Sequence, residues 1–235
     1  MQQTDSFSLS SSAVKNRTIL RNVYLWMTAG LALTGVVALF VSTNRSFVRA
    51  LATNPLLFWG LIIGEVALVF YLSARITKMS PTAATGAFAV YAALNGVTLS
   101  LIFIAYTGVT LATAFFVTAG TFAGMSLYAV TTKTDLSGFG NYLMMALIGI
   151  IIASVVNFFL QSTLMYWIIS YAGVGIFMGL TAYDTQIIKR WSEQLDNSVD
   201  ESMFIKISIL GALKLYLDFI NLFLFFLRIF GGSRN

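Results

Sequence analysis

The chain has 235 residues, of which 58% are hydrophobic and only 10% are charged. Soluble domains carry about 25% charged residues, so this composition excludes a water-soluble globular protein and indicates an integral membrane protein. The net charge of +5 is assigned to loops that orient the membrane spans, and not to a surface that binds nucleic acid.

The sequence contains no cysteine and no histidine. The absence of cysteine excludes disulfides and thiol chemistry. The absence of histidine removes the usual proton switch near neutral pH, so any proton sensing must fall to carboxylates. A bound metal would have to be a hard cation such as calcium or magnesium, and we expect neither a cofactor nor an enzymatic activity.

The chain reads as one membrane domain, residues 22–230, between two short tails. The polar, serine-rich residues 1–21 are expected to form a cytoplasmic tail, and residues 231–235 a C-terminal one. A membrane span needs about 20 mostly apolar residues, and seven such stretches occur. They are predicted at 22–43, 56–76, 86–106, 110–130, 142–161, 164–187 and 207–230. The one sizeable connection is a charged loop at 189–206.

The distribution of lysine and arginine in short loops predicts the orientation. With the N-terminus in the cytoplasm, the inner side holds Lys15, Arg17, Arg21, Arg75, Lys78, Lys133, Lys189, Arg190 and Lys206. The outer side holds only Arg45, Arg49, Arg228 and Arg234. Seven spans then place the C-terminus outside the cell.

Ionisable residues inside spans are the first functional candidates, because a charge in the bilayer is costly and usually faces a partner. Asp184 lies five residues before Lys189, and Asp218 lies four residues after Lys214. If both lysines reach the inner interface, the two aspartates lie at a similar depth. Arg75 falls near that level.

The matching depth leaves two interpretations of the aspartates open. In one, Asp184 and Asp218 form a buried pair that shares a proton, because two close carboxylates do not both ionise easily in a poor dielectric. Such a pair could latch two helices, sense pH or hold a calcium ion. In the other, each aspartate separately satisfies backbone groups near a helix end. We favour the pair.

Glu65 is expected to lie deeper in the membrane than the aspartates. It stands ten residues before Arg75 in the second span, which places it about 15 Å further from the inner face. It is predicted to pair with a polar side chain such as Asn95, or to line an ion path. Asn95, Asn157 and Asn221 are expected to make interhelical hydrogen bonds, and the glycines of "GVGIFMG" (173–179) to permit close helix packing.

The last two spans carry a family resemblance. "LYLDFINLFLFFLRIFG" (215–231), with "AYDTQ" (182–186) before it, resembles the Bax inhibitor-1 family in a bacterial form, and "GEVALVFYLSARI" (64–76) supports this. The resemblance covers nearly the whole chain. It implies an all-α membrane fold with a central seventh helix wrapped by the other six, located in the cell inner membrane.

The resemblance also implies an activity, a pH-sensitive calcium leak. In the family picture, an aspartate pair between the last two spans is the proton sensor and gate, and the motifs map it onto Asp184 and Asp218. Arg75 corresponds to the family's second-span arginine, a latch partner. Glu65 corresponds to its second-span acidic position.

Two other classes of membrane protein, intramembrane aspartyl proteases and retinal proteins, fit the sequence less well. An intramembrane aspartyl protease would place Gly-x-Gly-Asp at the second aspartate, where this chain has "LYLD", and would use a Pro-Ala-Leu segment, whereas the only prolines are Pro55 and Pro81. A retinal protein would use a lysine in the last span, but Lys214 is expected near the interface and the third span holds no acidic counter-ion.

The main alternative is a regulatory protein that binds another membrane protein, such as a quality-control protease. The N-terminal tail and the 189–206 loop would then be docking surfaces. The favoured hypothesis is a calcium leak channel whose partners are the lipid bilayer and calcium ions, with no nucleic acid.

Overall fold

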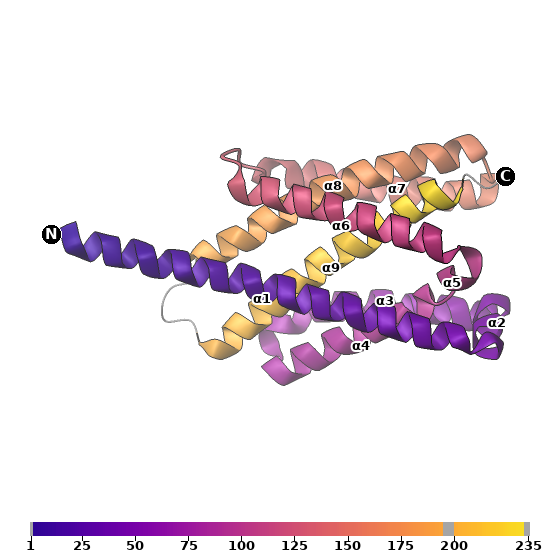
Figure 1. The fold of residues 1–235 in the computed structure, drawn as a ribbon, viewed down its shortest axis with the longest axis horizontal. Helices are drawn as coiled ribbons and strands as arrows, with labels where there is room; N and C mark the ends of the chain where they lie inside the picture. The colour runs from indigo at the N-terminus through magenta and orange to yellow at the C-terminus, as the bar shows by residue number, and fades with distance from the viewer. Residues whose placement is uncertain (1, 195–199, 233–235) are drawn as a thin grey trace. The chain divides into compact units, whose positions relative to one another are not determined.

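The computed structural model describes residues 2–194 and 200–232, and these form helices joined by short turns, without a β-strand in that part of the chain (Figure 1). The elements run in the order α1 (Gln2–Thr43), α2 (Arg45–Thr53), α3 (Pro55–Arg75), η1 (Ile76–Lys78), α4 (Pro81–Leu99), α5 (Ile102–Ala105), α6 (Gly108–Thr131), η2 (Ser137–Phe139), α7 (Gly140–Leu160), α8 (Thr163–Gln194) and α9 (Glu201–Gly231).

Seven of the described helical segments are long and apolar enough to cross a membrane, which confirms the predicted all-α, seven-span class. The last of them, α9, is the most buried. In its most apolar stretch 61% of the residues are buried, against 6–33% in the other six. The central place expected for the last span stays a prediction.

Several helices extend beyond the predicted spans. The helix α1 begins at Gln2, so the polar N-terminal tail continues the first span as helix. Likewise α8 runs to Gln194 and α9 starts at Glu201, which turns most of the predicted 189–206 loop into helix, while residues 195–199 lie outside the described part. Neither segment contains a proline or glycine, so nothing stops an established helix from propagating.

The short helix α2 was not predicted. Asn44 caps its start, because the Asn44 side chain accepts a hydrogen bond from the backbone N–H of Phe47 at 3.1 Å. Asn54 ends α2 and caps α3 by accepting from Leu56 at 3.1 Å, and Pro55 occupies the first position of α3. Asparagine at a cap and proline at the first helical position are favourable start signals, so the sequence did carry this information.

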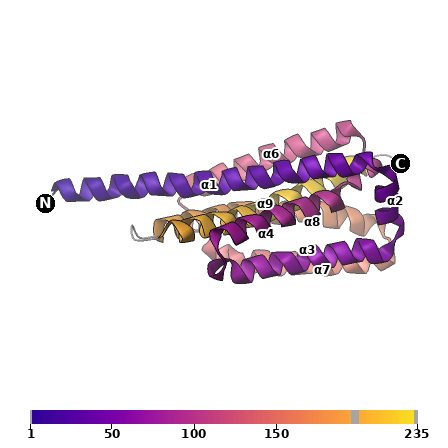
Figure 2. The same cartoon turned by 90° about the horizontal axis from the view of Figure 1, so that it is seen from below.

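The chain divides into two compact units, and the first comprises Met1–Thr107 and Trp191–Tyr216. Within it, α4 packs against α1 and α3, and Figure 2 shows α4 between them. Close approach at Gly96 allows the α1–α4 contact, since a Cβ atom there would lie 2.6 Å from the carbonyl oxygen of Thr34.

The second unit comprises Gly108–Arg190 and Leu217–Asn235. Its helix α8 contacts both α7 and the C-terminal half of α9 through glycines. A Cβ atom at Gly173 would clash with the ring of Phe225 on α9, and one at Gly179 would lie 2.7 Å from Leu143 on α7. The close packing predicted for the 173–179 glycines is therefore confirmed at these two positions.

Candidate functional site

Asp184 lies on α8 in the second unit, and its side chain is 6% exposed. The residues on either side of it contact other helices. The hydroxyl of Thr185 donates to the hydroxyl of Ser126 on α6 at 3.4 Å, and the ring of Tyr183 packs onto Gly140 at the start of α7. The sequence places Asp184 at the meeting of α6, α7 and α8 because small and polar residues let these helices approach.

Asp218 lies on α9, also in the second unit, and is 4% exposed. Its neighbour Phe219 packs edge-on against Phe122 and Phe115 of α6, with ring centres 5.5 and 5.8 Å apart. Aromatic pairs in this geometry fix the rotation of a helix about its axis. Asp218 is therefore held inside the unit and not toward lipid.

The neighbours of both aspartates contact α6. Thr185 contacts Ser126, whereas Phe219 contacts Phe122 and also Phe115, further along the helix. Both aspartates therefore lie on helices that pack against α6, and neither carboxylate is isolated. The matching depth inferred from the sequence stays a prediction. The shared proton stays a prediction.

A resident calcium site would need more ligands than this pair offers. Calcium takes six to eight oxygen ligands. Within residues 2–194 and 200–232, acidic side chains do not gather in groups of three or more. The tentative assignment of Asp184 and Asp218 as calcium ligands stays a prediction.

Glu65 lies in the first unit, on α3, and is 8% exposed. The hydroxyl of Thr98 on α4 donates to one carboxylate oxygen, and the amide nitrogen of Asn95 lies 3.5 Å from the other. Asn95 also donates to the hydroxyl of Tyr91 at 3.1 Å. The predicted pairing of Glu65 with Asn95 is confirmed, whereas Thr98 was not foreseen.

The other two asparagines do not bridge helices, so that expectation was wrong for them. Asn157 accepts from the backbone N–H of Ser162 at 3.0 Å, just beyond the end of its helix. Asn221 donates to the carbonyl of Leu217 on its own helix at 2.8 Å. Both bonds are local because the backbone group is already within reach of the side chain.

Arg75 is the last residue of α3 and its side chain is exposed. It belongs to the first unit, whereas Asp184 and Asp218 belong to the second. Its role as a latch partner stays a prediction.

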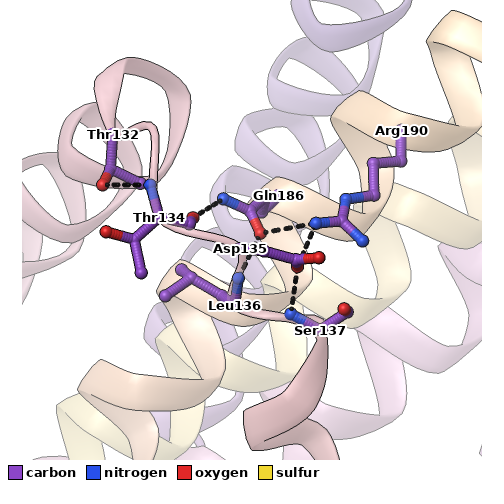
Figure 3. A network of polar contacts seen from close by, with 7 residues as sticks. All are labelled: Thr132, Thr134, Asp135, Leu136, Ser137, Gln186 and Arg190. Atoms are coloured by element: carbon purple, nitrogen blue, oxygen red, sulfur yellow. Dashed lines mark hydrogen bonds and ion pairs between the residues drawn. The ribbon is translucent and has the colours of Figure 1, made fainter.

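A polar network that sequence reasoning missed joins the α6–α7 connection to α8 (Figure 3). Gln186, two residues after Asp184, accepts from the backbone N–H of Leu136 at 2.7 Å and donates to the carbonyl of Thr134 at 2.9 Å. Arg190, one turn further along α8, forms an ion pair with Asp135. The network fixes the connection to the end of α8 that follows Asp184.

Asp135 is the charged centre of this network and is 64% exposed. It accepts from the backbone N–H of Ser137 at 2.8 Å. The hydrogen bonds from the backbone and side chain of Ser137, followed by that from Arg190, lower the pKa of Asp135 to about 2. The segment "TDLSG" (134–138), with an aspartate two residues before a serine, is a turn signal that could have indicated the site.

Comparison with known proteins agrees with the resemblance in the last two spans. A model of the family described as inhibitor of apoptosis-promoting Bax1 matches residues 16–235. The chain is 53% identical over 234 residues to the inner membrane protein YbhL of Escherichia coli K12, covering 98% of this chain and all of that protein. It is 44% identical over 222 residues to a protein of Borreliella burgdorferi, covering 94% of each. It is 38% identical over 231 residues to a membrane protein of Streptococcus pyogenes serotype M3, covering 97% of this chain and 99% of that one.

Proposed function

Because the chain belongs to the Bax inhibitor-1 family, we propose that it is a pH-sensitive cation leak channel with calcium as the favoured ion. Its place is the bacterial inner membrane, as in the Escherichia coli relative. The proton sensor is the carboxylate pair of Asp184 and Asp218.

The observation that carries this proposal is the burial of two acidic residues in successive spans, 6% and 4% exposed, on helices that both pack against α6. Packing alone does not account for buried aspartates, because an apolar residue would fill the same space at lower cost. In a chain without histidine, such carboxylates are the groups able to respond to pH inside the membrane.

The pair acts as a latch through one shared proton. With a single proton, one carboxyl donates to the other carboxylate and holds α8 against α9. Full ionisation makes the two carboxylates repel, and full protonation removes the charge-assisted bond. Either change releases the latch and opens the path, with Arg75 as the proposed latch partner and Glu65 as a carboxylate along the ion path.

Calcium flux into dye-loaded liposomes containing the purified full chain tests the proposal. The flux is scanned from about pH 5 to about pH 8, where a coupled carboxylate pair would titrate. Wild-type flux should vary with pH, lowest where the pair holds one proton. Asp184→Asn and Asp218→Asn should each flatten the profile, because an amide does not titrate.

Matched controls lie on the same two helices. Glu193→Gln on α8 and Glu201→Gln on α9 remove exposed carboxylates and should leave the pH profile unchanged. A pH profile in the aspartate variants that matches wild type would refute the sensor. Flux no greater than in empty liposomes at every pH would refute the channel and favour the regulatory protein that needs a partner.

A further inference from the structure

A pocket of about 920 Å³ opens on the first unit where α1 ends and the chain turns into α3. Both polar and apolar side chains line it. The residues that matter for its chemistry are Ser42 of α1, Arg45, Ser46 and Arg49 of α2, and Phe103 and Ile104 of α5.

The helix α2 turns two arginines toward this pocket. Val48 and Leu51 are buried beneath α2, whereas Arg45 and Arg49 are exposed. The arginines are four residues apart, so they stand side by side on one face of the helix. Both guanidinium groups are exposed at the surface of α2, and arginine stays protonated at every pH near neutrality, so their charge can act on a ligand.

The position of the pocket decides what kind of anion reaches it. The first apolar helix ends at Thr43 and the next begins at Pro55, so α2 lies where the hydrocarbon layer gives way to the headgroup region. Paired guanidinium groups suit phosphate oxygens, which they bind through several charge-assisted hydrogen bonds. The positive end of the α2 dipole, at Arg45 and Ser46, adds to the attraction.

The apolar wall argues for a lipid and not for a free phosphate ion. Ile104 is 63% exposed and Phe103 is half-buried beside it. A free phosphate would gain nothing from these surfaces, whereas an acyl chain running down from a bound headgroup would cover them.

We propose that this pocket binds the phosphate headgroup of an anionic phospholipid, with Arg45 and Arg49 on the phosphate and Phe103 and Ile104 against the acyl chain. The site lies wholly in the first unit and is independent of the aspartates of the second. It makes the connection between the first two spans a point at which lipid composition acts on the protein.

Native mass spectrometry of the purified full chain in detergent tests the site, with phosphatidylglycerol as the anionic probe and phosphatidylcholine as the zwitterionic one. Wild type should bind phosphatidylglycerol more tightly. The double variant Arg45→Gln/Arg49→Gln should raise the Kd for phosphatidylglycerol on the order of twentyfold, from the loss of two basic contacts near a membrane surface.

The matched control removes two exposed cations elsewhere, Arg21→Gln with Lys133→Gln, and should keep wild-type affinity. Ser46→Glu provides a second variant that is compatible with folding, because an acidic residue in the first turn of α2 suits the helix dipole. It should still weaken phosphatidylglycerol binding by charge repulsion.

Three results would overturn the proposal. Equal weakening in both double variants would show that lipid binding follows net charge alone. Full displacement of phosphatidylglycerol by millimolar inorganic phosphate would show a simple anion site. Unchanged affinity in both Arg45→Gln/Arg49→Gln and Ser46→Glu would show that the pocket holds no lipid.

Discussion

Glu65 in the first unit and Asp135 in the second are both bound by polar side chains, but the two carboxylates sit in opposite environments. Glu65 in the first unit is 8% exposed and is bound by Thr98 and Asn95 of the adjacent helix. Asp135 in the second unit is 64% exposed and is bound by Ser137 and Arg190.

This difference indicates that the burial of a carboxylate affects how much its partners stabilise the protein more than the charge on those partners does. The neutral partners of Glu65 replace the water that burial removed, so losing one leaves a polar group unsatisfied. The charged partner of Asp135 competes with water and dissolved salt, and exposed ion pairs contribute little. We therefore expect the neutral network to be the more sensitive to mutation.

The largest effect is expected for Thr98→Val, which removes the hydroxyl that donates to Glu65 while keeping the size of the side chain. The free energy of unfolding should fall by about 2 kcal/mol, the cost of an unsatisfied buried group. Unfolding in mixed detergent micelles measures it. Thr131→Val is the control, because the Thr131 hydroxyl bonds only carbonyls of its own helix. Equal losses in both variants would contradict the comparison.

A smaller effect is expected for Gln186→Leu in the second unit. Gln186 is 8% exposed and bridges two backbone groups of the α6–α7 connection, Leu136 and Thr134. We expect a loss of about 1 kcal/mol, since water near the exposed connection can replace part of the bonding. The same unfolding measurement applies, with Gln194→Leu at the exposed end of α8 as control. A larger loss of unfolding free energy in Gln186→Leu than in Thr98→Val would contradict the expected order of the two effects.

The smallest effect is expected for Asp135, and it should depend on pH. An unfolded aspartate has a pKa of about 4, whereas the folded value is lowered to about 2. A lowered folded pKa stabilises the protein above pH 4, and this contribution is lost as the pH falls from about 4 to about 2. The difference between wild type and Asp135→Asn in detergent unfolding should shrink across that window. If the stability difference between wild type and Asp135→Asn grew as the pH fell, the pKa of Asp135 would be raised by folding and not lowered.

The sequence predicted the features that depend on composition and spacing. Apolar length predicted the seven spans, and the rarity of charge in lipid pointed to Glu65, Asp184 and Asp218. All three are buried. Asn95 was named as an example of a polar partner for Glu65, and the two side chains are in contact.

The missed features depend on contacts between distant segments or on short-range capping. Gln186 and Thr134 are 52 residues apart in sequence, and no local pattern brings a glutamine to a turn so far away. Thr98 passed unnoticed because a threonine in an apolar helix commonly bonds its own backbone. The helix α2 was not predicted for another reason. Its nine residues are too few to be recognised as a separate helix beside spans of about twenty residues.

The two glycine contacts of α8 limit how that helix can move. Gly173 and Gly179 are six residues apart, so they point in directions about 120° apart around the helix axis. One receives Phe225 of α9 and the other receives Leu143 of α7. A roll of α8 in either sense would drive backbone into a side chain. The rotation of α8 about its own axis is therefore fixed, so Asp184 keeps facing in one direction. These two contacts do not prevent a hinge-like tilt of the helix.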